Sequence, residues 1–311
     1  KLFRVSLLLF LVGWFPTGAL AGVSKAVFDF GGNPVTLQRA IELAIEHNPE
    51  LNVSRWETRA MEGRVLQAGL LPNPEIEAET ENFAGSGAFK GFDAAETKLE
   101  LSQLIELGGK RAKRSTHAAL GRDLAQWDYA VTRADVVAVV RLTFMNVLFA
   151  QERLKLMEKL LYLADEVLQT TSERVKAGKI SPVEAVRAEV DRSTSRIDVK
   201  NARYDLKVAK RKLSDAWGGT TPTFGEARGS LGKLQPLPSL ESLEKLVSQN
   251  PDVARWAVAI EQHRAGVDLE EARGVPDLTV SLGAKHFNEV DDTAFIMKVS
   301  IPIPIFDINQ G

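Results

Sequence analysis

Two segments of the chain repeat one order of apolar and polar positions. Asn48-Pro49 recurs as Asn250-Pro251, and the same spacing carries through the helix-like and strand-like patterns that follow. After a shorter loop in the second copy, Leu99 aligns with Met297. A match that keeps this order over a whole unit indicates an internal repeat, although two unrelated amphipathic stretches would share part of it. Each copy begins with an apolar period of three to four residues, which in the first copy runs from Leu37 to Pro72 and predicts a helix.

A two-residue alternation follows each helix and predicts strands. In the first copy, one face carries Glu75, Glu77, Glu79 and Glu81, and the other carries Ile76, Ala78 and Thr80. The return strand has Leu99, Leu101, Ile105 and Leu107 on its apolar face, opposite Lys98, Glu100, Ser102 and Glu106. In the second copy the apolar positions are Leu278, Val280 and Leu282, followed by Met297, Val299, Ile301, Ile303 and Ile305.

These strands have about the 9 to 11 residues that a tilted transmembrane strand needs. A soluble, half-buried sheet shows the same alternation, so the strands alone leave both possibilities open. Four strands cannot close a barrel, and an open sheet edge is not tolerated in lipid. A membrane-spanning arrangement therefore requires several copies of the chain, and three copies would supply about 12 strands.

A long helical hairpin is predicted between the two copies. Residues 110–175 contain no proline, and at about 1.5 Å per residue they would reach roughly 100 Å. The seam positions, spaced by threes and fours as in a coiled coil, are Met157, Leu161, Ala164, Leu168, Thr171 and Val175. On the returning helix, 181–217, they are Val183, Val186, Val190, Ser193 and Ile197, and then Val199, Ala202, Leu206, Ala209, Leu213 and Ala216.

The hairpin turn lies at residues 177–180. Gly178 suits a left-handed C-terminal cap, Ser181 an N-cap and Pro182 the first helical turn, and Glu184 completes a capping box. Local capping accounts for these residues without a partner. A tip held so far from the sheet also suits contact with another protein.

Residues 136–150 interrupt this amphipathic pattern. Their apolar residues spread to all sides, and only Arg141 is charged. This section is too short to cross a bilayer, so we expect it to be buried on every side by residues 218–238 and the N-terminal portion. Antiparallel pairing about the turn places Trp217 near residue 139. Arg141 is then expected to contribute more to stability than most surface residues.

Composition excludes several classes of protein. The 39 Lys and Arg against 41 Asp and Glu give a net charge of −2, which does not fit a nucleic-acid binder that acts through bulk charge. The absence of cysteine excludes disulfides, thiolate metal sites, cysteine nucleophiles and a lipidated N-terminal cysteine. The sequence contains no catalytic elbow, phosphate loop or paired zinc-ligand histidines, so we predict neither an enzyme nor a cofactor or metal site.

Both ends of the chain have a distinct pattern. Lys1 and Arg4 precede an apolar run, and Ala19 and Ala21 stand before a plausible cleavage point, as in a secretory signal peptide. The chain starts without Met and stops at Gly311 after a strand-like run. From the length of the first hairpin we expect roughly 100 further residues that form a second one.

Several motifs together resemble the TolC-type outer-membrane efflux family, in particular its heavy-metal cation branch of CzcC-like proteins. The resemblance covers essentially the whole mature chain. The residues that carry it are 40–51 with Asn48-Pro49, 71–74, 101–111, the tip 174–184 and 301–307.

The resemblance implies a mainly α fold with transmembrane β: a homotrimer with a pooled barrel of about 12 strands in outer-membrane lipid, continued by a periplasmic helical tunnel. It also implies a duct for heavy-metal cations, joined through a periplasmic adaptor to an inner-membrane pump of the resistance-nodulation-division type. The residues that match the family's pattern at the adaptor-docking hairpin tip are Arg174, Gly178, Ser181 and Glu184. The alternatives are a multidrug or small-molecule duct of the same fold and a periplasmic adaptor.

The predicted organisation follows from these elements. It comprises a signal segment (1–21), an N-terminal segment with the first helix (22–74), a first strand pair (75–107), the hairpin (108–217), an equatorial linker (218–238), a second helix (239–276), a second strand pair (277–305) and the start of a second hairpin (306–311). The acidic face Glu75, Glu77, Glu79 and Glu81, if it faces the barrel lumen, would favour cations by its field. Barrel lumens are also polar without such a role.

Overall fold

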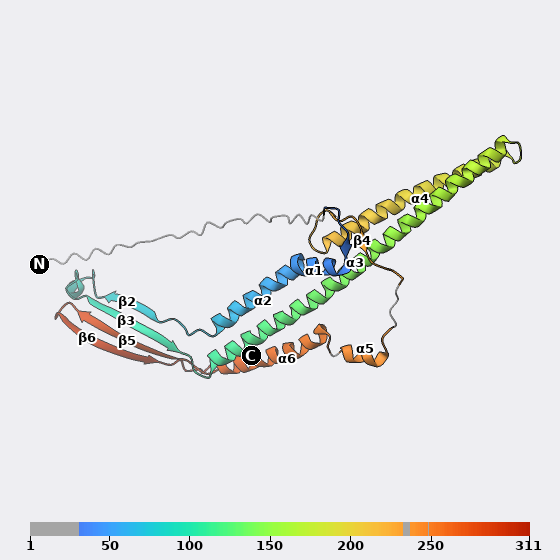
Figure 1. Cartoon of the computed structure of the whole chain (residues 1–311). Helices are drawn as coiled ribbons and strands as arrows, with labels where there is room; N and C mark the ends of the chain where they lie inside the picture. Colours follow the sequence, from blue (N-terminus) through green and yellow to red (C-terminus); the bar gives the residue numbers. More distant parts are fainter. Residues whose placement is uncertain (1–30, 233–236, 248) are drawn as a thin grey trace.

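The computed structural model describes residues 31–232, 237–247 and 249–311, and it shows an elongated molecule. A sheet lies at one end and the tip of a helical hairpin at the other, with helix α3 running between them (Figure 1). The predicted signal segment, 1–21, lies outside the described residues.

The elements follow one another in the order expected from the repeat. The first copy comprises β1 (Val35–Thr36), α1 (Leu37–His47), α2 (Pro49–Ala68), β2 (Glu75–Glu81) and β3 (Glu96–Ile105). The hairpin is α3 (Lys110–Lys176) and α4 (Pro182–Asp215), followed by β4 (Ala227–Arg228). The second copy comprises α5 (Leu240–Val247), α6 (Pro251–Arg273), β5 (Leu278–Phe287) and β6 (Asp292–Ser300).

The two Asn-Pro pairs occupy equivalent places, because each begins a helix. The side chain of Asn48 caps α2 through the Leu51 N–H at 3.1 Å, and that of Asn250 caps α6 through the Asp252 N–H at 2.9 Å. The prediction of one helix from Leu37 to Pro72 was wrong at this point. Asn48 leaves the helical region (ψ 128°), so α1 ends there and α2 starts at the proline, as capping residues dictate.

The four long strands form one antiparallel sheet in the order β2-β3-β5-β6. Pairing of β3 with β5 joins the two copies, with Leu101 opposite Leu282. The second strand pair is shorter than predicted: β6 ends at Ser300, and Ile301, Ile303 and Ile305 lie beyond it. Pro302 and Pro304 explain the difference, since proline has no N–H to donate to a strand ladder.

Helix α3 is unbroken over 67 residues, which corresponds to about 100 Å. Helices α2 and α6 pack along its first part and α4 along its second part (Figure 1). By length and composition alone α3 could cross a membrane, because its most apolar 18 residues have a mean hydropathy of 1.4. The core helix of a folded domain passes the same test. In α3, 39% of that apolar stretch is buried, on the face that packs into the hydrophobic core.

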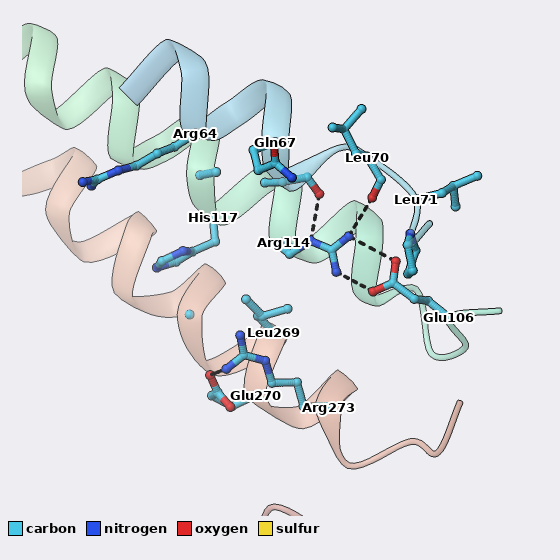
Figure 2. A pocket seen from close by; sticks show the side chains of 14 residues that line it. Arg64, Gln67, Leu70, Leu71, Glu106, Arg114, His117, Leu269, Glu270 and Arg273 are labelled. Carbon is cyan, nitrogen blue, oxygen red and sulfur yellow. Dashed lines mark hydrogen bonds and ion pairs between the residues drawn. The ribbon is translucent and has the colours of Figure 1, made fainter. Parts of the chain in front are cut away.

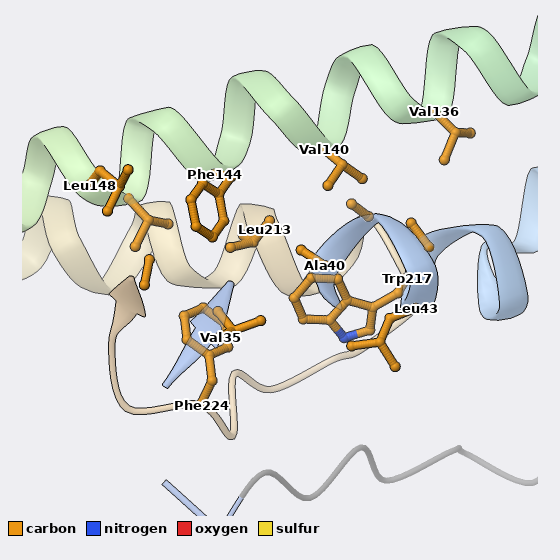
Figure 3. Close-up of a cluster of buried hydrophobic side chains, with 14 of the residues drawn as sticks. Val35, Ala40, Leu43, Val136, Val140, Phe144, Leu148, Leu213, Trp217 and Phe224 are labelled. Atoms are coloured by element: carbon orange, nitrogen blue, oxygen red, sulfur yellow. The ribbon is translucent and has the colours of Figure 1, made fainter. Parts of the chain in front are cut away.

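That core, which we call the equatorial core, lies where α1, α3 and α4 meet (Figure 3). Trp217 packs in the same cluster as Val140, as the antiparallel pairing predicted, and the linker contributes Phe224 and Ala227. Gln151 fixes β4 in place, since its Oε1 accepts from the Ala227 N–H at 2.8 Å. The buried members are Val35, Ala40, Leu43, Ala44, Leu51, Val136, Val140, Phe144, Val147, Leu148, Leu213, Ala216, Trp217, Phe224 and Ala227.

Residues 136–150 are nevertheless buried on one side only. Val139, Leu142 and Phe149 are exposed over 51%, 64% and 61% of their surface. Arg141 is exposed as well, so the reason for expecting a large contribution from it does not hold. Among the described residues, the linker and the N-terminal portion cover only one face of α3.

The hairpin seam follows the prediction on α3 and on the second half of α4, where Val199, Ala202 and Leu213 are buried. On the first half of α4 the prediction was wrong. Val183, Val186, Val190 and Ile197 are exposed, Ser193 also lies outside the seam, and Ala188 is buried against α3 in their place. A small side chain lets the two helix backbones come close, and the valines are left on the outer side.

Candidate functional site

The four-stranded sheet has one charged and one apolar face. The register places Glu77 beside Glu100 and Glu79 beside Lys98, so the acidic side chains of β2 continue across β3. On the opposite face the row Ile76, Leu101, Leu282 and Met297 crosses all four strands. The apolar face is open, and exposure reaches 72% at Met297 and 92% at Phe295.

Two lysines form ion pairs with most of the acidic side chains on the charged face. Lys98 Nζ lies 3.1 Å from Glu77, 3.0 Å from Glu79 and 3.6 Å from Glu100. Lys285 Nζ lies 2.6 Å from Glu81 and also contacts Glu96. Lys98 and Lys285 are themselves cross-strand neighbours. The charged face is therefore a ladder of ion pairs, in which the predicted glutamates Glu77, Glu79 and Glu81 have partners.

Glu75 differs from the other three glutamates of β2. It lies opposite Ser102, and no cation contacts it among the described residues. Sequence reasoning placed the four glutamates on one face correctly, but it missed both lysines as their partners. The strand alternation fixes faces, whereas the partners depend on the register between strands.

The passage from sheet to helices depends on two consecutive glycines. Gly108 and Gly109 have φ of +67° and +70°, and Gly109 is the N-cap of α3. A Cβ on Gly108 would lie 2.9 Å from Val275 Cβ and 3.2 Å from the Ala272 carbonyl oxygen. Asp277 stands beside this turn, where it accepts from the Leu107 N–H at 2.9 Å and from Lys110 Nζ at 2.8 Å.

Arginines at the start of α3 hold the end of α2 (Figure 2). Arg114 donates to the carbonyl oxygens of Ala68 at 2.8 Å and Leu70 at 3.1 Å, and Arg111 donates to that of Gly69 at 2.7 Å. Arg114 also pairs with Glu106, whose carboxylate raises the pKa of the guanidinium. These bonds satisfy the carbonyls of Ala68, the last residue of α2, and of Gly69 and Leu70, which directly follow it and have no helical partner. Arg114 and Glu106 also line a cavity of about 730 Å³ between α2, α3 and α6.

The hairpin tip is closed by backbone hydrogen bonds. Gly178 has φ of +74°, its N–H donates to the Val175 carbonyl at 2.9 Å, and the Lys179 N–H donates to the Arg174 carbonyl at 2.9 Å. This is the Schellman pattern expected for a helix that ends before a left-handed glycine. The Arg174 side chain is exposed and has no ion-pair partner among the described residues.

The predicted capping box is absent from the second side of the tip. Ser181 Oγ accepts from the Val183 N–H at 3.4 Å, while the Glu184 carboxylate pairs with Arg187 at 3.1 Å. An arginine three residues further along the helix competes for the same carboxylate, which the sequence pattern alone does not weigh. Arg174, Gly178, Ser181 and Glu184 thus lie together at the end of the molecule farthest from the sheet (Figure 1).

Within residues 31–232, 237–247 and 249–311, no group of three or more His, Asp or Glu side chains is arranged to hold a metal ion. The described residues form a sheet with one charged and one apolar face, a hydrogen-bonded junction and a long helical hairpin.

Known proteins share this arrangement. The chain is 38% identical over 281 residues to the cobalt-zinc-cadmium resistance protein CzcC of Cupriavidus metallidurans, a match that covers 89% of the chain and 65% of the relative. It is 24% identical to the nickel-cobalt-cadmium resistance protein NccC of Alcaligenes xylosoxydans xylosoxydans, over 89% of the chain and 62% of the relative. The chain therefore spans less than two thirds of the length of these proteins.

Solved structures agree in fold. A crystal structure of CusC superposes with a TM-score of 0.68 at 18% identity, over 88% of this chain and 67% of that one. The Campylobacter jejuni CmeC outer membrane channel superposes with a TM-score of 0.70 at 16% identity, over 88% and 63% of the two chains. The predicted fold, strand pairs joined to a long helical hairpin, is confirmed. Residues 40–219 match the family model for outer membrane efflux proteins, and the chain belongs to that family.

Proposed function

We propose that the chain forms part of an export duct in the bacterial outer membrane, with its helices in the periplasm. Three copies pool their strands into a barrel of about 12 strands. The observation that supports this proposal is the sheet, which is apolar and exposed on one face and charged on the other, and whose two edges have no further strand beside them within the described residues. Lipid would cover the apolar face and water would fill the charged side, as transmembrane barrels require.

The cargo that we propose is heavy-metal cations. Support comes from the relatives CzcC and NccC, which are resistance proteins for cobalt, zinc, nickel and cadmium. The duct works with a resistance-nodulation-division pump in the inner membrane and a periplasmic adaptor, which docks at the tip formed by Arg174, Gly178, Ser181 and Glu184. The charged ladder of the sheet faces the lumen.

Growth of a strain lacking the gene tests the function. The strain, with and without the gene restored, is grown across cobalt, zinc, cadmium, copper and silver salts and a panel of dyes and antibiotics. We expect sensitivity to divalent metals that the restored gene reverses. Sensitivity to organic compounds alone would support an export duct but contradict heavy-metal cations as its cargo.

Fractionation tests the location separately. A duct stays with the outer membrane after salt and carbonate washing, whereas release into the wash would favour a periplasmic adaptor.

Docking at the tip is tested by co-purification with the adaptor. Arg174→Glu reverses an exposed charge without touching the backbone bonds that close the turn, and we expect it to weaken adaptor capture. Lys159→Glu makes the same change on an exposed position of α3 away from the tip and serves as the control. Equal capture of both variants would remove the tip from the proposal.

The role of the ladder in ion preference is tested in planar bilayers. Replacing Glu75, Glu77, Glu79 and Glu81 together by Gln is expected to reduce the preference for cations over anions. Reversal potentials that stay unchanged under a salt gradient would leave the ladder as a polar lumen surface with no influence on ion choice.

A further inference from the structure

The sheet ends in two strands that each have a partner on one side only. β2 pairs with β3 and β6 pairs with β5, and within the described residues the outer sides of β2 and β6 have no strand beside them. Because every pair in the sheet is antiparallel, β2 and β6 run in opposite directions. The β6 edge of one copy can therefore continue into the β2 edge of another as an ordinary antiparallel pair, which would satisfy both rows of backbone groups.

The charges at these two edges are complementary. On the charged face, β2 carries a glutamate at every position: Glu75, Glu77, Glu79 and Glu81. On the same face β6 carries a single cation, Lys298, which lies in one cross-strand row with Ser281, Ser102 and Glu75. β6 also carries Asp292 on this face, in the cross-strand row of Glu81 at the other end of the strand. The β2 edge is thus acidic along its length, and the β6 edge presents an ammonium group near one end and a carboxylate at the other.

Lys298 is unlike the other two lysines of this face. Lys98 and Lys285 lie on the central strands and each contact two or more carboxylates. Lys298 is exposed, and the described residues place no carboxylate within ion-pair distance of it. Its place on an edge strand explains this, since its neighbours on one side belong to no part of the described chain.

Barrel closure sets which residues meet at such a seam. Strands of closed barrels tilt by about 35° to 45°, so the pairing is staggered from one copy to the next. The stagger must be even in number, because an odd shift would put a charged face beside an apolar one. For each of the four even registers that put Lys298 against β2, its neighbour is a glutamate.

We propose that Lys298 on β6 of one copy forms an ion pair with a glutamate on β2 of the next, at the seam where two copies join their sheets. The inference rests on the proposed function and assigns residues to the contact between copies. A cross-strand pair of opposite charges favours the matching register, and two acidic edges facing each other would be repelled.

Disulfide scanning tests the seam directly, because the chain has no cysteine to interfere. Lys298→Cys is combined in turn with Glu75→Cys, Glu77→Cys, Glu79→Cys and Glu81→Cys in the full chain, and mild oxidation is followed by gel electrophoresis. Disulfides need Cβ atoms about 3.5 to 4.5 Å apart. We therefore expect cross-linked oligomers at one position or at two adjacent ones. Ile76→Cys and Ala78→Cys, on the opposite face of the same strand, are the controls and should stay uncross-linked.

Charge reversal tests the ion pair itself. Lys298→Glu is expected to lower the fraction of associated chains by about threefold or more, and a Glu→Lys change at the cross-linking position should restore it. Lys159→Glu controls for loss of a positive charge elsewhere.

The outcomes separate the inference from the proposed function. Chains that associate, as judged by an amine-reactive cross-linker, but that give no disulfide at any of the four positions would overturn the seam and leave the duct. If the disulfide forms but Lys298→Glu does not change association, the contact between β6 and β2 stands and the ion pair is contradicted. A chain that remains monomeric in lipid would overturn both.

Discussion

Apolar side chains are buried in the equatorial core and exposed in the sheet. In the core, Trp217, Phe144 and Val140 retain 2% or less of their exposed surface. In the sheet, Ile76, Met297 and Phe295 remain exposed over 76%, 72% and 92%. The core is buried within one chain, whereas the described part of the chain leaves the apolar face and both edges of the sheet uncovered. Stability of the single chain should therefore come from the middle of the molecule, and the sheet should depend on its surroundings.

The largest difference in stability between the two regions is expected when one aromatic residue in each is truncated. Trp217→Ala should lower the free energy of unfolding by about 3 to 5 kcal/mol, because it empties a site that the structure fills completely. Phe295→Ala, in detergent-free buffer, should change it by less than about 0.5 kcal/mol, since the ring already faces outward. Guanidinium unfolding followed by circular dichroism measures both. Similar losses in the two variants would contradict the division between regions.

The next largest effect on the free energy of unfolding is expected at the junction between the sheet and the helices. Gly108→Ala is expected to destabilise by about 2 kcal/mol, since the backbone has φ of +67° and the new methyl group would press against Val275. Gly87→Ala is the matched control: it shares the positive φ, +64°, but no atom lies within 4 Å of its Cβ position. The difference between the two unfolding free energies measures the contact alone. Equal losses would show that only the backbone conformation matters.

The Asn-Pro repeat places the same residue in two environments. Asn48 is buried, and besides capping α2 it donates from Nδ2 to the Ala216 carbonyl at 2.8 Å, which ties α2 to the end of α4. Asn250 is exposed, and within the described residues its side chain caps α6 without a second bond. We expect Asn48→Ala to cost about 2 kcal/mol and Asn250→Ala about 1 kcal/mol in the same unfolding measurement. A larger cost at Asn250 would place more of the stability outside the equatorial core than the burial indicates.

The smallest effect is expected at Arg141. Its side chain lies on the open side of α3, so Arg141→Ala should shift the free energy of unfolding by less than about 0.5 kcal/mol. Val140→Ala, one position along the helix and fully buried, is the comparison and should cost about 2 kcal/mol. An Arg141 variant as unstable as the Val140 variant would mean that the open side of α3 is covered in the isolated chain.

Periodicity in the sequence predicted the features that depend on one element at a time. The α3 seam, the left-handed Gly178 and the separation of glutamates from apolar residues on β2 all follow from local spacing. The pairing of Lys98 with Glu77 and Glu79 did not follow, because it depends on how two strands are aligned. The α4 prediction failed for a related reason. Val183, Val186 and Val190 share the helical period with Ala185 and Ala188, and it is Ala188 that is buried against α3.

The predicted boundary between the first strand pair (75–107) and the hairpin (108–217) located the junction but not its contacts. No pattern indicates that Arg111 and Arg114 donate to the last carbonyls of α2, since those partners are more than 40 residues away along the chain. Such contacts appear only when the helices have been placed side by side.

The single helix α3 also has a mechanical consequence. The equatorial core holds α3 near its middle. From Leu148, the last α3 residue in that core, to Lys176 at the end of the helix is 28 residues, or roughly 42 Å. A helix held in this way acts as a lever with the core as its fulcrum. A tilt of about 5° at the fulcrum displaces the far end by about 3.5 Å. By this geometry, a small change in the packing around Val140 and Phe144 would produce a displacement of several ångströms at the tip.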